Sequence, residues 1–549
     1  MPEYLSPGVY VEEVDRGPKP IEGVGTAMAA FVGFTEKAEL EREIDGEIIT
    51  QNLLNRPQLI TNWSQYIQSY GAFVPGAYLP QAVYGYFMNG GTRCYVVSVR
   101  TIPQAQAALL NSEGKPQLIV RAKQAGFEGL RLRVRIEEVK AIAAPAKGKK
   151  PAAKEGEAKA ADEADEGGSF TLIVERERLT SGWKVEEQFQ GVTLQETTVD
   201  RKKQVFVAFK DNKIPRLVEL LMPERAAPLA KLWPQQQEQP LNIVTEQLPA
   251  PSTQEFQGKV TERTGVEGLE ALDDVTILCV PDLMTPMPGQ ELELDTIKAV
   301  QSMMIAHCER LGDRVAIIDP PPDLLPQEVK KWRMDVAGYD SNYAALYYPW
   351  IQVMDPVTNR PISVPPSGHL AGIWGRNDAT RGVHKAPANE VVLGAIGLAY
   401  QTTKGEQDTL NPIGVNCIRA FPGRGIRVWG ARTLTSDPAW RYINVRRLFN
   451  FVEKSIEGGT QWVVFEPNDR KLWARVRRDI TAFLKVVWRS GALFGSSPNE
   501  AFYVKCDDEL NPPESRDLGR LIIEIGMAPV KPAEFVIFRI SQWAGPGSE

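Results

Sequence analysis

The sequence is poor in the residues that most often bind metal or carry out catalysis. Its 549 residues include three histidines, His307, His369 and His384, and five cysteines. No C-x-x-C, H-x-H or H-E-x-x-H pattern occurs. A zinc site needs histidine, cysteine or carboxylate ligands at short spacing. We therefore predict no metal and no cofactor, and we expect free, buried thiols in a protein made in a reducing cytoplasm.

Motifs of nucleophilic and nucleotide-dependent catalysis are also missing. There is no G-x-S-x-G elbow and no Walker A loop. The glycine-rich stretch FPGRGIRVWG leads into a strand-like run, whereas a phosphate-binding loop opens a helix. We therefore predict no catalytic residues and a protein that is not an enzyme.

Long apolar runs and a strong net charge are absent as well. No stretch of about 18 apolar residues could span a bilayer, and the first residues do not read as a secretory signal, so we expect no membrane insertion. The balance of 63 basic and 69 acidic residues does not suggest a nucleic-acid binder. The length predicts two to four domains, and 43% hydrophobic residues is ordinary for globular protein.

The sequence contains two stretches that alternate predicted helices and strands, residues 25–100 and 261–409. The segment between them has a different pattern of apolar and charged residues. In the second stretch, DDVTILCVPD, a helix and RVAIIDPPPD form a βαβ unit, which predicts a parallel sheet. Residues 101–260 instead alternate apolar and charged residues, as in LRLRVRIEEV. Within them, residues 141–168 contain no aromatic residue, and we expect them to be disordered. We interpret 101–260 as a β-rich subdomain inserted into one α/β domain.

A third section, residues 410–549, follows. INVRRLFNFVEKSIEGG predicts an amphipathic helix, QWVVFEP a strand, and Asp469–Ser490 a long helix. At 100° per residue, five cations of the long helix form one stripe opposite its apolar face. These are Lys471, Arg475, Arg478, Lys485 and Arg489. The stripe is either a solvated face or a contact for an acidic partner; without interleaved aromatics, nucleic acid is disfavoured.

The N-terminal residues contain a strand-like run that has no obvious partner. Val9, Tyr10 and Val11 lie between proline-containing segments in MPEYLSPGVYVEEVDRGPKP. A lone strand is not stable in water. We therefore expect residues 1–24 to form an arm and linker that pair outside their own subunit.

Three stretches together resemble the contractile tail sheath proteins of phage tails, R-type pyocins and extracellular contractile injection systems. They are YLSPGVYVEEVDRGPKPIEGVGTAMAAFVGF, GVEGLEALDDVTILCVPD, and the C-terminal NPIGVNCIRAFPGRGIRVWGARTL with WRYINVRRLFNFVEKSI, FEPND and LW. Residues 101–260 are not covered, as expected for a family in which this region is a variable outer insertion.

The resemblance implies a fold and a function. It implies an α/β, multidomain (α+β) protein with a subtilisin-like middle domain that lacks the catalytic triad, and a C-terminal sheath core. Such subunits polymerise in six-start hexameric layers around an Hcp-like inner tube, between a baseplate and a terminator or cap protein. They contract to drive the tube through a target envelope. The alternatives are a static tube or baseplate component and, ranked last, a subtilisin-like hydrolase.

The resemblance also implies roles for particular residues. Both termini are expected to exchange strands between subunits, and the basic stripe to contact the tube. The exchange residues are Val9, Tyr10, Val11, Phe535, Val536, Ile537, Phe538 and Ile540. Assembly is expected in the bacterial cytoplasm, as part of a phage tail or a tail-like particle that can be released from the cell.

Overall fold

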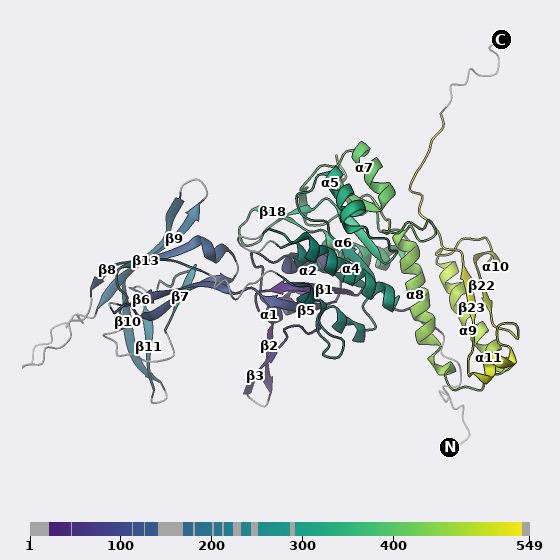
Figure 1. Cartoon of the computed structure of the whole chain (residues 1–549), viewed down its shortest axis with the longest axis horizontal. Coiled ribbons are helices and arrows are strands. Elements are labelled where there is room, and N and C mark those ends of the chain that lie inside the picture. The colour runs from purple at the N-terminus through teal and green to yellow at the C-terminus, as the bar shows by residue number, and fades with distance from the viewer. Residues whose placement is uncertain are drawn as a thin grey trace, which may run out of the picture.

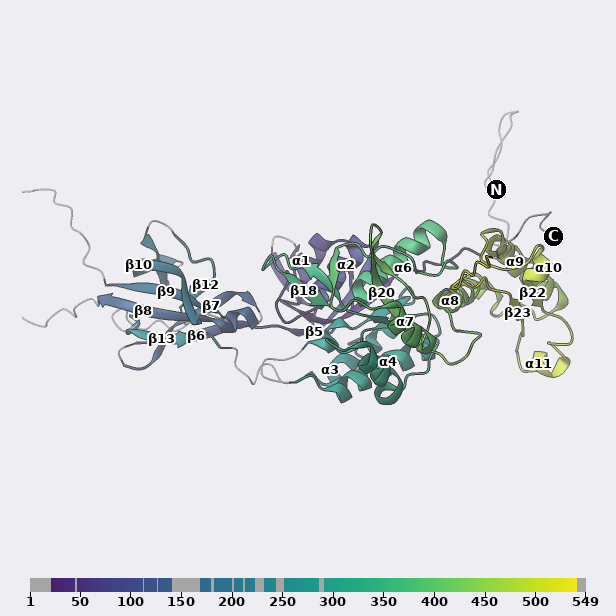
Figure 2. The same cartoon turned by 90° about the horizontal axis from the view of Figure 1, so that it is seen from above.

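The chain folds into three bodies that follow one another along its long axis (Figures 1 and 2). A β-rich body lies at one end, an α/β body in the middle and a smaller helix-rich body at the other end. The computed structural model describes residues 21–44, 47–111, 113–125, 127–140, 168–178, 182–199, 202–210, 213–222, 232–242, 251–285 and 291–540.

The middle body is built on an eight-stranded sheet in the order β21-β20-β16-β15-β14-β1-β5-β4. Its strands are β1 (Ala29–Thr35), β4 (Gln58–Ile60), β5 (Cys94–Thr101), β14 (Ile277–Cys279), β15 (Val315–Ile318), β16 (Ala344–Tyr348), β20 (Val415–Phe421) and β21 (Gly425–Val428). The six inner strands pair in parallel, and only the edge strands β4 and β21 are antiparallel. The sheet runs past residue 409, where the sequence predicts the C-terminal section to begin.

Helices cover both faces of this sheet, so its strands are buried on both sides. In β1, Ala29 and Phe31 face one apolar core, while Ala30 and Val32 face the other. The first core is shared with α2 (Leu79–Met88) and α6 (Ser367–Arg381), and the second with α4 (Leu294–Leu311). This arrangement explains the near-continuous apolar strands in the sequence. The βαβ unit predicted at β14, α4 and β15 is confirmed.

Smaller elements complete the middle body. Asn62 caps α1 (Trp63–Tyr70) by accepting the N–H of Gln65 at 2.9 Å. The strand-like run YAALYYPWIQV is divided at Pro349 into β16 and β17, since proline has no N–H to donate to a ladder. The remaining elements are β2 (Glu39–Ile44), β3 (Glu47–Asn52), α3 (Thr253–Gln257), α5 (Pro326–Lys331), β17 (Ile351–Met354), β18 (Pro361–Val364), β19 (Ala395–Leu398) and α7 (Lys404–Leu410).

The inserted body lies between β5 and α3 and contains two sheets around a core of its own. Five strands form one sheet, in the order β11-β10-β9-β8-β13, and three form the other, β12-β7-β6. They are β6 (Gln104–Leu110), β7 (Pro116–Ala125), β8 (Leu132–Lys140), β9 (Ser169–Arg178), β10 (Gly182–Val199), β11 (Lys202–Ala208), β12 (Val218–Leu221) and β13 (Gln237–Pro240). The tract 141–168, except Gly168, lies outside the described residues.

The C-terminal body packs two long helices against a two-stranded sheet. Its elements are α8 (Ile443–Gly459), α9 (Arg470–Arg489), α10 (Pro498–Ala501), β22 (Phe502–Lys505), α11 (Pro513–Asp517) and β23 (Glu524–Met527). The two predicted helices are confirmed. The predicted strand QWVVFEP is wrong: Gln461–Val463 is a 3₁₀ turn. Trp462 and Val463 pack on the helix core, and the backbone bonds of the run close within the turn instead of pairing with a strand.

Candidate assembly surfaces

Helix α9 combines an apolar face with an exposed basic face. Asp469 caps it by accepting the N–H of Leu472 at 2.8 Å. The apolar face packs into the core shared with α8 and comprises Leu472, Trp473, Val476, Ile480, Phe483, Leu484 and Val487. The opposite face is therefore fixed in direction by the core.

The five predicted stripe residues are all exposed, but they are not equivalent. Lys471, Lys485 and Arg489 have no carboxylate within ion-pair distance among the described residues. Arg478 pairs with its neighbour Asp479 at 3.0 Å. Arg475 is engaged on the turn before the helix: its guanidinium lies 4.7 Å from the centre of the Trp462 ring and 3.5 Å from a Glu466 oxygen. Three cations are thus available to a partner, and one braces a turn.

The C-terminal segment is tied to the middle body before it leaves the molecule. Glu534 accepts hydrogen bonds from Arg432 Nη2 at 2.5 Å, Asn411 Nδ2 at 2.8 Å and Tyr442 Oη at 3.2 Å. Burial raises the pKa of Glu534, but the hydrogen bonds from Arg432 and Asn411 outweigh it and hold the pKa below its ordinary value. We call Glu534 and its three partners the clamp. No local pattern in the sequence indicates this clamp.

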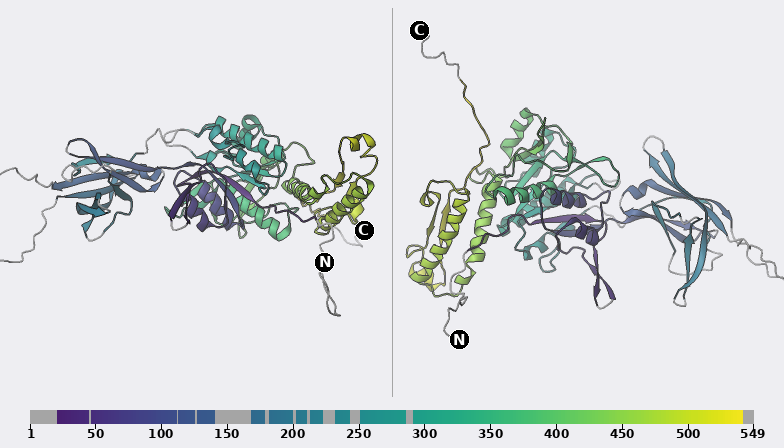
Figure 3. Two further views of the ribbon diagram at one scale, coloured as in Figure 1. Left: turned by 90° about the horizontal axis from the view of Figure 1, so that it is seen from below. Right: turned by 180° about the vertical axis from the view of Figure 1, so that it is seen from behind.

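Beyond the clamp the chain is extended and exposed. Figures 1 and 3 show it running away from the three bodies. The predicted exchange residues Phe535, Val536, Ile537, Phe538 and Ile540 expose between 71% and 95% of their surface and belong to no strand of the described structure. Such a row of apolar side chains is unusual on a monomer surface. The other predicted exchange residues, Val9, Tyr10 and Val11, lie outside the described residues.

The small sheet of the C-terminal body has open edges. β22 and β23 pair antiparallel, with Tyr503 opposite Gly526, and neither has a second strand beside it in the described structure. A groove of about 720 Å³ lies between β22 and α9. It is lined by Arg477, Arg478 and Lys485 of the helix and by Phe502, Tyr503 and Val504 of the strand. Arg477, which the predicted stripe omits, faces this groove.

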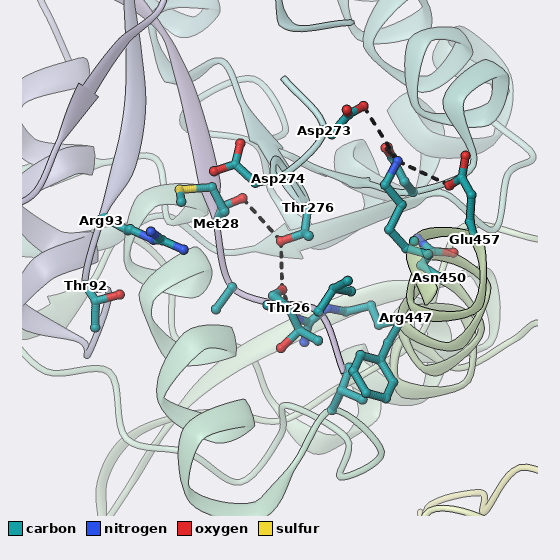
Figure 4. Close-up of a pocket in the computed structure, with 18 of the residues that line it drawn as sticks. Thr26, Met28, Thr92, Arg93, Asp273, Asp274, Thr276, Arg447, Asn450 and Glu457 are labelled. Atoms are coloured by element: carbon teal, nitrogen blue, oxygen red, sulfur yellow. Dashed lines mark hydrogen bonds and ion pairs between the residues drawn. The ribbon is translucent and has the colours of Figure 1, made fainter. Parts of the chain in front are cut away.

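The middle and C-terminal bodies are joined by a charged seam along α8. Arg447 donates to both carboxylate oxygens of Asp378 on α6, at 2.9 and 2.5 Å, and to the Thr26 carbonyl at 2.9 Å. The Arg447 and Asp378 side chains are both buried. Beside them is a cavity of about 500 Å³ that is lined by residues 24–28 and by α8 (Figure 4). In this lining, Lys454 lies 3.6 Å from Asp313. The seam ties α8 to the middle body.

The few cysteines and histidines do not form a site. All five thiols are free and buried. His369, at the start of α6, is buried, and burial lowers its pKa to about 4; burial, with Arg314 and Arg310 adding to it, lowers that of His307 to about 3. In the part of the chain that the structure describes, no three histidine, cysteine or carboxylate groups converge as metal ligands would, and no helix is long and apolar enough to cross a membrane.

Comparison with known proteins gives the family. Residues 259–434 match the phage tail sheath protein central domain, and residues 435–542 match the phage tail sheath C-terminal domain, together just over half of the chain. The chain is 28% identical over 291 residues to a prophage major tail sheath protein of Pseudomonas aeruginosa, covering 51% of this chain and 70% of that one. It is 25% identical over 293 residues to the tail sheath protein of Vibrio phage KVP40, covering 49% of this chain and 43% of that one.

The chain therefore belongs to the phage tail sheath protein family. Solved structures share its fold over almost the whole chain. One belongs to the anti-feeding prophage baseplate, at 22% identity and a TM-score of 0.55, covering 98% of this chain and 99% of that one. Another is the sheath complex of an extracellular contractile injection system in its contracted state, at 22% identity and a TM-score of 0.55, covering 99% of each chain.

Proposed function

We propose that this chain is the structural subunit of a contractile sheath, which polymerises as a helical array around an inner tube and shortens to drive that tube through a target envelope. One observation carries the proposal: each subunit has an apolar, extended arm that belongs to no sheet in the described structure, and a two-stranded sheet to which a further strand could be added. The arm is Phe535–Ile540 and the sheet is β22 with β23.

The arm of one subunit can pair with the two-stranded sheet of a neighbouring subunit. An extended segment adds to an exposed sheet edge through main-chain hydrogen bonds, while alternate side chains fill pockets. The groove is lined by α9 and by β22, which is one of the two edge strands of this sheet. We assign Val9, Tyr10 and Val11 to the same kind of contact. A contact between different surfaces of identical subunits generates an open helical array when its rotation does not close into a ring.

Contraction is then a switch between two packings of one rigid subunit. The seam of Arg447 and Asp378 supports movement of the middle and C-terminal bodies together. Reversing a two-state population from 1:99 to 99:1 takes about 5.5 kcal/mol, so a small difference per subunit suffices in a cooperative array. We assign the middle body to a subtilisin-like fold without catalysis, and the partners to a tube, a baseplate and an end cap. Assembly in the bacterial cytoplasm belongs to the same proposal.

Blocking the backbone of the arm tests the proposal. Ile537→Pro removes an N–H donor without altering a folded body, and it should leave soluble subunits that do not form sheath in electron micrographs. Arg539→Ala, on the same arm, keeps every backbone donor and should assemble. Sheath of normal length from the proline variant would contradict strand addition, and particles of a single length in every preparation would favour a static component over a contractile one.

A further inference from the structure

The turn between α8 and α9 holds an aromatic ring in solvent. Phe465 is 102% exposed, and Val464 beside it is 63% exposed. Exposed aromatic side chains of this kind are costly in water and are typical anchors of protein interfaces. The turn belongs to the stretch that the sequence predicted as a strand, so its exposure could not be foreseen.

The turn is braced on both sides of Phe465. Before it, Trp462 packs on the core and lies under the Arg475 guanidinium. After it, Glu466 pairs with the same Arg475, and Asn468 accepts the indole N–H of Trp473 at 2.8 Å. The backbone of the turn is therefore fixed and loses little freedom when a partner covers the ring, which favours tight binding.

The backbone at Phe465 is in a strained conformation. Its φ of 67° lies in the left-handed region, which disfavours residues with a bulky side chain. The other non-glycine residues with positive φ in the described part of the chain are Asn55, Glu138, Arg263, Asp323, Asn359 and Asn389, all polar. An apolar residue that combines strain with complete exposure contributes nothing visible to the stability of the subunit, and such outliers indicate function.

We propose that Phe465, with Val464, is the apolar anchor of the surface that contacts the inner tube, and that it enters an apolar hollow on an acidic tube face. The proposal rests on the proposed function. Its support is continuity with the basic stripe: Arg475, a stripe residue, contacts Trp462 before Phe465 and Glu466 after it. A central aromatic surrounded by charged residues is the usual anatomy of an interface.

The position of the turn separates it from the exchange arm. The clamp includes Tyr442, directly before α8, whereas the turn follows the other end of that helix. A helix of 17 residues is about 25 Å long at 1.5 Å per residue. The subunit's own arm, which leaves the molecule at the clamp, therefore does not cover Phe465.

Two substitutions in the full-length chain separate the effect of the Phe465 ring on tube binding from the effect of its strained backbone on stability. Phe465→Gly removes the ring and suits positive φ, so its thermal midpoint should not fall below that of the wild type. Its co-sedimentation with tubes of the tube protein from the same particle should weaken about tenfold or more, as for loss of an interface anchor. Phe465→Leu keeps an apolar side chain and should bind tubes more tightly than the glycine variant.

A third variant tests this proposal separately from the proposed function on which it rests. Reversing Lys471, Lys485 and Arg489 to glutamate should abolish tube binding, while reversing Lys330, Lys331 and Lys404 on α5 and α7 should not. If the stripe reversal has no effect, the proposed tube contact itself fails. If it acts but Phe465→Gly binds tubes normally, only the role of Phe465 is overturned. A glycine variant that binds tubes but loses tube-free self-association would assign the ring to a second copy of the chain.

Discussion

At the scale of single residues, Asp319 couples the stability of the middle body to pH. It follows β15 and is 3% exposed, and its Oδ1 accepts the N–H of Ser367 at 3.0 Å. Burial raises the pKa of this carboxyl group to about 7, against the opposing hydrogen bonds from Ser367. Because the folded state binds this proton more tightly than the unfolded state, its contribution to stability is complete below about pH 4 and is lost as the pH rises to 7.

Asp319→Asn should therefore flatten the dependence of the free energy of unfolding on pH. The amide oxygen can still accept from Ser367, but it has no proton to lose. Each tenfold difference in proton affinity corresponds to about 1.4 kcal/mol, so the variant should be the more stable protein at pH 8 and not at pH 4. Denaturant unfolding at several pH values measures this, with the exposed Asp408→Asn as control. Parallel curves for the wild type and Asp319→Asn would contradict the prediction.

At the scale of elements, the clamp fixes where the C-terminal arm begins. Arg432 is 7% exposed, and its guanidinium has Glu534 as its carboxylate partner. Glu534→Gln keeps the size of the side chain but leaves a buried cation without an opposite charge, which costs about 1–3 kcal/mol at the hydrogen bond. Amide hydrogen exchange in residues 528–534 should accelerate about tenfold for each 1.4 kcal/mol, whereas Glu514→Gln on α11 should change nothing there. Unchanged exchange would show that the arm is held by its backbone alone.

How much of an element the sequence predicts depends on the range of the forces that form it. α8 and α9 were predictable because their apolar residues recur at helical spacing and α9 opens on a capping aspartate. The run VVF before Glu466 has the composition of a strand, yet among the described residues no neighbouring strand pairs with it, and short apolar runs are ambiguous for this reason. The clamp joins Glu534 to Arg432, which is 102 residues earlier in the sequence, so local residue spacing does not indicate it. The stripe was predicted as a surface, but the separate role of Arg475 required the position of Trp462.

At the scale of the whole molecule, the inserted body is connected to the middle body by two chain segments that lie side by side. Arg100 at the end of β5 and Glu255 in α3 form a two-point ion pair, with both N···O distances 2.6 Å. The core of the inserted body is separate from the two cores of the middle body. Since its entry and exit are already side by side, a short linker can replace it with little cost in loop closure.

Excising residues 104–249 and joining the ends with about four glycine and serine residues, a common connection length, should thus leave a folded chain. The excised protein should retain the cooperative unfolding of its middle body, with a midpoint within a few degrees of the wild type, because the two remaining cores lose only Ala125 of β7 among their buried residues. If arms and sheet edges in the C-terminal body build the array, it should also still assemble, which negative-stain microscopy shows. Adding Arg100→Ala to it removes the ion pair at the joint and should lower the midpoint. Loss of the fold on excision alone would mean that the inserted body stabilises the middle body, and folded protein that cannot assemble would place array contacts on the insertion.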